Sequence, residues 1–164
     1  MLSVPESTSF TWRLSIKTAR KKPRFIIVGF QTKNPSTVDH VNLKNAYETP
    51  NSDRYLAVDY NVSFFNQKLS MVYGDVALFG VKFFGMDELI TQCNITSSDY
   101  KTLYHLLTFD VSKHKEQLKS SVVDIQVKAN FTENISANTR VFALVISDKM
   151  LSFRSDGNKM AVIY

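Results

Sequence analysis

The sequence has little that would cross-link a fold or anchor it in a membrane. Its single cysteine, Cys93, has no second cysteine with which to form an internal disulfide. A lone free thiol suits a reducing environment. No apolar run approaches the roughly 20 residues that a membrane-spanning helix needs, and the N-terminus has no secretory signal pattern. We therefore expect neither a disulfide-stabilised secreted domain nor a membrane span.

The common catalytic motifs are also missing. The chain has no G-x-x-x-x-G-K-[ST] loop for phosphates, no G-x-S-x-G turn for a nucleophilic serine and no H-E-x-x-H pair for zinc. The three histidines, His40, His105 and His114, do not show the short spacing of paired metal ligands. We expect no catalytic residue, no metal and no cofactor. An enzyme would require a cleft in which one of these histidines meets a carboxylate.

The positive charge of the chain is concentrated in short segments. The formal net charge is +5, and the stretch "KTARKKPRF" contains five cations, namely Lys17, Arg20, Lys21, Lys22 and Arg24. A second group, Lys113, Lys115 and Lys119, lies in "DVSKHKEQLKSS". Clustered cations bind nucleic acid by releasing condensed counterions. Each cluster also lies between strand-like runs, where polar turns are expected, and we favour the interpretation as solvated turns.

Two long apolar runs near the C-terminus predict strands. In the first run, residues 123–131, Val, Ile, Val, Ala and Phe alternate with polar residues, which indicates a strand with one buried face. The second run, Val141 to Ile146, is apolar at every position and predicts a strand near the centre of a sheet, covered on both faces. The polar segment "TENISANTR" lies between them and predicts a reversal that pairs the two runs as an antiparallel hairpin.

Further strand patterns fill most of the chain. The alternation in "FTWRLSIKT" and the apolar run in "RFIIVGFQT" predict a second hairpin over residues 10–31, with Pro23 at the start of its second arm. Weaker strand patterns are "VDHVNLKNAYE" and "RYLAVDYNVSF", while "LLTFDVS" and "KMAVIY" predict short strands. Seven or eight short strands in one chain indicate a β-sandwich or barrel.

One segment has a helical period instead. Over about 67–84, apolar residues recur at spacings of three and four, which predicts an amphipathic helix that covers an open end of the sheets rather than a cofactor pocket. Asn66 can cap its start, and Gly85 can adopt the left-handed conformation at its end. The stretch "SSDYKTLYHLL" predicts a second, short helix.

The chain as a whole is predicted to be all-β. Its 164 residues fit a single domain over 1–164 that buries a sizeable core, with a flexible N-terminal segment over residues 1–9. The fold expected is a single jelly-roll β-sandwich with one amphipathic helix inserted over about 67–84.

A series of stretches resembles one known family. They are "PRFIIVGFQT", "NSDRYLAVDYNVSF", "FFGMDEL", "FDVSKHKEQLKSSVVDIQVKANFTENISANT", "ALVISD" and "SDGNKM". From about Trp12 to the end, the chain resembles the C-terminal half of double jelly-roll domain proteins, the major capsid proteins of Polinton-like and adintovirus-like elements. The resemblance implies icosahedral shells built from trimers, in which each subunit has two jelly rolls. This chain has room for one.

The resemblance implies a structural role with no catalytic residues. We therefore expect a capsid-type jelly-roll protein, or a genome-integrated remnant of one, that acts by self-assembly in a virion. Its expected partners are other copies, as a trimer, and other capsid proteins. The alternative is a jelly-roll binding module for nucleic acid, through the cations from Lys17 to Arg24, or for carbohydrate, through exposed aromatics such as Tyr47, Tyr55 and Tyr60. Such a module would reside in the host cytoplasm or nucleus.

Overall fold

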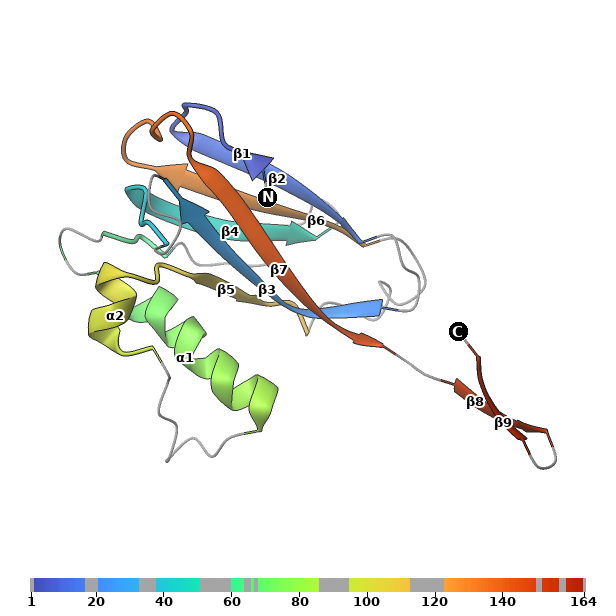
Figure 1. The fold of residues 1–164 in the computed structure, drawn as a ribbon. Coiled ribbons are helices and arrows are strands. Elements are labelled where there is room, and N and C mark those ends of the chain that lie inside the picture. Colours follow the sequence, from blue (N-terminus) through green and yellow to red (C-terminus); the bar gives the residue numbers. More distant parts are fainter. Residues whose placement is uncertain are drawn as a thin grey trace.

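The fold is described from a computed structural model. It describes residues 2–16, 21–32, 38–50, 60–63, 66, 68–85, 95–112, 123–149, 152–156 and 159–163. Figure 1 shows two layers of strands, two helices below them and a small hairpin that extends away from the body.

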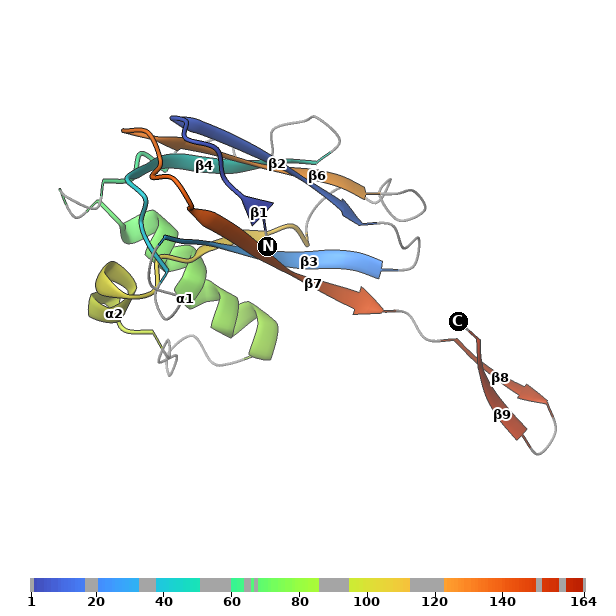
Figure 2. The same ribbon diagram turned by 45° about the horizontal axis from the view of Figure 1, so that its top comes forward.

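The body is a sandwich of two antiparallel sheets. The first sheet has the order β1-β7-β3-β5 and contains β1 (Leu2–Ser3), β7 (Arg140–Lys149), β3 (Lys21–Gln31) and β5 (Leu107–Asp110). The second has the order β2-β6-β4 and contains β2 (Ser9–Ile16), β6 (Val123–Phe131) and β4 (Leu43–Pro50). Figure 2 shows the second sheet lying above the first. The prediction of an all-β jelly-roll sandwich is confirmed.

Successive strands of the sandwich alternate between the two sheets. From β2 to β7, every step along the chain crosses from one sheet to the other. The predicted hairpin over residues 10–31 is therefore wrong, because β2 pairs with β6 while β3 pairs with β5 and β7. The predicted pairing of the two C-terminal runs is wrong for the same reason, because β6 and β7 lie in different sheets. The chain reverses between these strands without pairing them.

The core lies between the inner faces of the two sheets. On β6, Ile125, Val127, Ala129 and Phe131 are buried, whereas Gln126, Lys128 and Asn130 between them are partly exposed, as the alternation predicts. Ile26, Val28 and Phe30 of β3 pack against them from the other sheet. Pro23 lies in β3 beside a shift of register between Pro23 and Phe25, which suits a residue that cannot donate a hydrogen bond.

The strand β7 packs on the core with one face, and its other face is partly exposed. Val141 is buried, and Ala143 and Val145 pack against the core, but Leu144 is 56% exposed. The prediction that Val141 to Ile146 is buried on both faces is therefore wrong. The neighbour β1 pairs only with Arg140 and Val141, so β7 is an edge strand along most of its length in the part of the chain that the structure describes.

Two helices cover the lower side of the sandwich in Figure 1. The helix α1 (Ser70–Phe84) confirms the amphipathic helix predicted over about 67–84, and it packs against β5. It ends at Gly85 in the left-handed conformation, as predicted, but its first turn has no side-chain cap and begins after Leu69 rather than Asn66. The short α2 (Ser97–Thr102) confirms the second helical segment, and Thr96 caps it by accepting from the Asp99 N–H.

The N-terminal strand of the described chain pairs with the sandwich, whereas the two C-terminal strands pair only with each other. We expected residues 1–9 to be flexible, but β1 pairs with β7, and the buried Val4 donates its N–H to the Thr139 carbonyl at 2.9 Å. At the other end, β8 (Ser152–Asp156) and β9 (Lys159–Ile163) pair with each other as a separate two-stranded sheet. Both views show this hairpin projecting beyond the end of β7 (Figures 1 and 2).

Candidate functional site

The predicted nucleic-acid contacts are only partly placed. Lys17 and Arg20 lie outside the described residues, whereas Lys21 and Lys22 are the first residues of β3 and pair with Lys149 and Asp148. This part of the segment is therefore strand rather than turn. Arg24 is exposed, and its Nη1 lies 3.6 Å from Oδ2 of Asp148. An exposed ion pair at this distance holds Arg24 weakly. The second group, from Lys113 to Lys119, lies outside the described residues.

Two of the three histidines meet in space. The rings of His40 and His105 lie edge to face, with centroids 5.3 Å apart. His105 is buried, and its Nδ1 and Nε2 lie 2.5 Å and 2.6 Å from the carbonyl oxygens of Val38 and Lys101. Both ring nitrogens are thus occupied by backbone contacts. His114 lies outside the described residues.

The less buried partner of this pair is His40, whose Nδ1 accepts the Asn42 N–H at 3.0 Å. Burial lowers the pKa of His40, and so does the nearby His105, while Asp39 acts in the opposite direction. The Asp39 carboxylate accepts hydrogen bonds from the N–H and the hydroxyl of Thr32. These hydrogen bonds stabilise the local backbone around His40. Within the described ranges, no group of three or more acidic, cysteine or histidine side chains is placed to hold a metal.

A basic cleft begins beside His40. It has a volume of about 710 Å³, and Lys44, Lys68 and Lys101 lie on its walls with the amides of Asn42, Asn61 and Asn66. No carboxylate is among the described residues that line it, and no ion pair holds the three lysines within the described chain. The electrostatics of this cleft favour an anion. No pattern in the sequence reveals this cleft, because the three lysines lie far apart in the chain.

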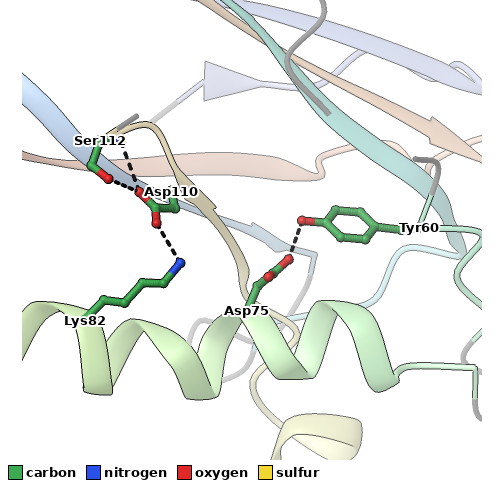
Figure 3. A network of polar contacts seen from close by, with 5 residues as sticks. All are labelled: Tyr60, Asp75, Lys82, Asp110 and Ser112. Atoms are coloured by element: carbon green, nitrogen blue, oxygen red, sulfur yellow. Dashed lines mark hydrogen bonds and ion pairs between the residues drawn. The ribbon is translucent and has the colours of Figure 1, made fainter. Parts of the chain in front are cut away.

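A polar network links α1 to the sandwich (Figure 3). The Tyr60 hydroxyl donates to Oδ2 of Asp75 at 2.6 Å, and Nζ of Lys82 donates to Oδ2 of Asp110 at 2.7 Å. Ser112 donates its N–H and hydroxyl to Oδ1 of Asp110 at 3.1 Å and 2.5 Å. The Tyr60–Asp75 bond therefore attaches α1 to the segment that precedes it in the chain. The Lys82–Asp110 bond attaches α1 to β5.

The two carboxylates of this network have opposite pKa shifts. Burial raises the pKa of Asp75, and the negative charge of Asp110 raises it further. The hydrogen bond from Tyr60 and the charge of Lys82 lower it, but they do not outweigh burial. Burial also acts to raise the pKa of Asp110, but hydrogen bonds from Lys82 and Ser112 outweigh it and leave the pKa lowered. Burial raises the pKa of Tyr60, so its hydroxyl remains a proton donor at neutral pH. These groups stabilise a fold and do not line the basic cleft.

An apolar surface covers the outer side of the first sheet. It consists of Phe142, Leu144 and Ile146 on the outward face of β7, with Phe83 and Phe84 at the end of α1, and we call it the outer apolar face. Leu144 is 56% exposed and Phe84 is 66% exposed. These fractions are high for large apolar side chains.

Phe25 lies between the two parts of the outer apolar face and is buried there. Phe25 is the cross-strand partner of Ile146, and its ring meets the ring of Phe83 edge to face at a centroid distance of 6.1 Å. The helix therefore covers the outer side of β3 at Phe25 and stops short of β7. Contiguous apolar surface of this kind marks interaction sites in soluble proteins.

Comparison with known proteins gives one family. The family model described as a double jelly roll-like domain matches residues 2–151. The match includes every strand of the sandwich and both helices, and it ends immediately before β8. No curated protein and no solved structure matches the chain. Among the described helices none is both long and apolar enough to cross a membrane.

Proposed function

Since the chain belongs to the double jelly roll-like domain family, we propose that it is a structural component of a virion and acts by binding copies of itself. Domains of this family are typical of viral capsid proteins. The resemblance to capsid proteins of Polinton-like elements supports a trimer, other capsid proteins as further partners and a location in the virion.

The outer apolar face carries this proposal. A strand with apolar residues on both faces is stable when both faces are covered, and β7 has one face packed on the core and the other exposed at Leu144. Burial of such side chains drives association at about 25 cal/mol per Å² of apolar surface. A second subunit would supply the missing cover.

A structural role also agrees with the way in which His105 and the carboxylates of Asp75 and Asp110 are engaged among the described residues. We propose that the chain is not an enzyme. Both ring nitrogens of His105 face backbone carbonyls, and the carboxylates of Asp75 and Asp110 are held by Tyr60 and Lys82. A general base needs a nitrogen or oxygen that can reach a substrate proton, and these groups are already engaged.

Substituting Leu144 with glutamate tests the assembly proposal. Leu144→Glu places a charge at the centre of the outer apolar face, and sedimentation velocity should show a shift from oligomer to monomer. The matched control is Thr11→Glu, because Thr11 is an exposed strand residue on the other sheet. If Leu144→Glu and Thr11→Glu sediment alike, the outer apolar face does not mediate assembly.

The basic cleft favours a second candidate function, the binding of nucleic acid through its phosphates. Lys44, Lys68 and Lys101 supply cations without a carboxylate among the described lining residues. Each phosphate contact should contribute about 0.7 to the salt slope for single-stranded nucleic acid. Replacing all three lysines by glutamine should therefore lower the slope measured with a single-stranded oligonucleotide.

The control for this second candidate is the cluster predicted from the sequence. Replacing Arg20, Lys21 and Lys22 by glutamine removes the same formal charge from that cluster. If the control lowers oligonucleotide affinity and salt slope while the cleft variant does not, the segment from Lys17 to Arg24 is the contact. If neither variant changes them, the nucleic-acid function is wrong.

A further inference from the structure

The hairpin β8–β9 forms a two-stranded sheet of its own among the described strands. Its strands pair from Ser152 with Ile163 to Asp156 with Lys159, and among the described strands neither pairs with the sandwich. It projects past the end of β7 in both views (Figures 1 and 2). A two-stranded hairpin is marginally stable alone in water, and stability requires a third strand or a packed face.

The register of the hairpin divides its residues into two unlike faces. Phe153 and Val162 are cross-strand partners, and Ser155 and Met160 form the next pair on that face. The other face carries the charged positions of the hairpin, Arg154, Asp156 and Lys159. The hairpin therefore has one predominantly apolar face, which is typical of a strand pair that joins a larger sheet.

The body of the protein offers an open strand edge of the right kind. β3 pairs with β7 along its whole length, but on the opposite side β1 pairs only with Arg140 and Val141. From Phe142 to Lys149, the described structure places no strand against that edge. An unpaired edge presents a row of N–H and C=O groups to any extended segment, and this edge borders the exposed Leu144.

The hairpin cannot readily turn back onto the edge of its own β7. Only Met150 and Leu151 connect β7 to β8. Two-residue turns between antiparallel strands favour Asn, Asp and Gly, which accept positive φ, and neither connecting residue is of this type. The hairpin of another copy has no such restriction.

We propose that the β8–β9 hairpin of one copy adds to the open edge of β7 in a second copy and extends its four-stranded sheet. Main-chain hydrogen bonds would provide the affinity, and cross-strand contacts between apolar side chains of the hairpin and Leu144 would add to it. The family match ends at Leu151, immediately before the hairpin. This inference rests on the proposed self-assembly and names the segment that mediates it.

The exchange is tested by removing the donor and the acceptor in separate variants of the full chain. The donor variant carries Met160→Asp and Val162→Asp, and the acceptor variant carries Leu144→Glu. Each alone should self-associate about tenfold or more weakly than the native chain, because apolar anchors dominate such interfaces. Circular dichroism establishes that each variant is folded, and Thr11→Glu again serves as the surface control.

Mixing the two variants gives the decisive result. The acceptor variant still has an intact hairpin, and the donor variant still has an intact β7 edge, so their mixture should form heterodimers that neither forms alone. Sedimentation velocity with one variant fluorescently labelled detects them. If the native chain assembles but the donor variant assembles equally well, the exchange is wrong and self-assembly stands. If the native chain does not assemble at all, the proposed function is wrong as well.

Discussion

The ring of Phe142 on β7 lies across Gly29, its cross-strand partner on β3. A Cβ atom at Gly29 would lie 2.8 Å from Cε1 of Phe142 and 2.9 Å from Cγ1 of Val38. Both distances are shorter than any normal carbon contact. The glycine therefore makes room for the ring of Phe142, which a larger residue at this position would displace.

Gly29→Ala should destabilise the protein for this reason. Inserting a methyl group into a packed site forces neighbours to shift and costs about 1–3 kcal/mol. Urea denaturation should show a lower midpoint with an unchanged slope. If Gly29→Ala is as stable as the native chain, the ring of Phe142 can shift without cost, and the site is not tightly packed.

The helical glycines should respond in the opposite way. A Cβ at Gly74 or Gly80 in α1 would meet no atom within 4 Å among the described residues. No described backbone therefore packs close enough to α1 to require a glycine at these positions. Alanine at either position should stabilise the helix by about 0.5–1 kcal/mol. Thermal denaturation measures the gain. A loss of stability in both variants would mean that another segment packs against that side of α1.

The ion pair between Lys82 and Asp110 should make stability depend on pH. The folded pKa of Asp110 is below its ordinary value of 3.8, so the unfolded state binds the proton more tightly. The stabilisation is fully present above pH 3.8 and is lost as the pH falls through the folded pKa. Asp110→Asn should therefore be less stable than the native chain at neutral pH, and the difference should shrink in acid.

Asp75 provides the matched control for that experiment. Its folded pKa is raised, so the folded state binds the proton more tightly, and the native chain gains stability relative to Asp75→Asn as the pH falls. The two asparagine variants should thus diverge in opposite directions when unfolding is measured from about pH 7 to about pH 3. Parallel pH profiles would show that the two carboxylates do not have opposite shifts.

The hydrogen bond from Tyr60 to Asp75 should contribute measurably to stability. Tyr60 is buried, and Tyr60→Phe removes the donor and leaves a half-buried carboxylate oxygen unsatisfied, which costs about 1–2 kcal/mol. A double-mutant cycle with Asp75→Asn isolates the pair. The two changes should not be additive. Additive effects would mean that the hydroxyl and the carboxylate act independently of each other.

Local patterns predicted the elements of this fold well. The alternation around Val127 reports directly which face of β6 is buried, because neighbouring side chains on a strand point to opposite faces. The helix over Ser70–Phe84 and its end at Gly85 follow from spacing and from the conformational freedom of glycine. These features depend on residues close together in the chain, and the sequence shows such residues side by side.

Strand partners and surface sites depend on distant residues. Trp12 pairs with Val127, and Ile27 pairs with Leu144, so hairpins predicted from neighbouring runs were wrong. The contact between His40 and His105 and the lysines of the basic cleft likewise arise from separate segments. An apolar run such as Val141 to Ile146 shows that both faces need cover, but not whether the same chain or a second one supplies it.

The mass of the native protein in solution tests the central claim most directly. Light scattering should be recorded over a wide range of concentrations at constant salt. Self-assembly predicts a closed oligomer, a trimer by resemblance to capsid proteins, whose proportion rises with concentration. A single monomeric mass at every concentration would contradict the account, because the outer apolar face and the hairpin would then remain uncovered in the native state.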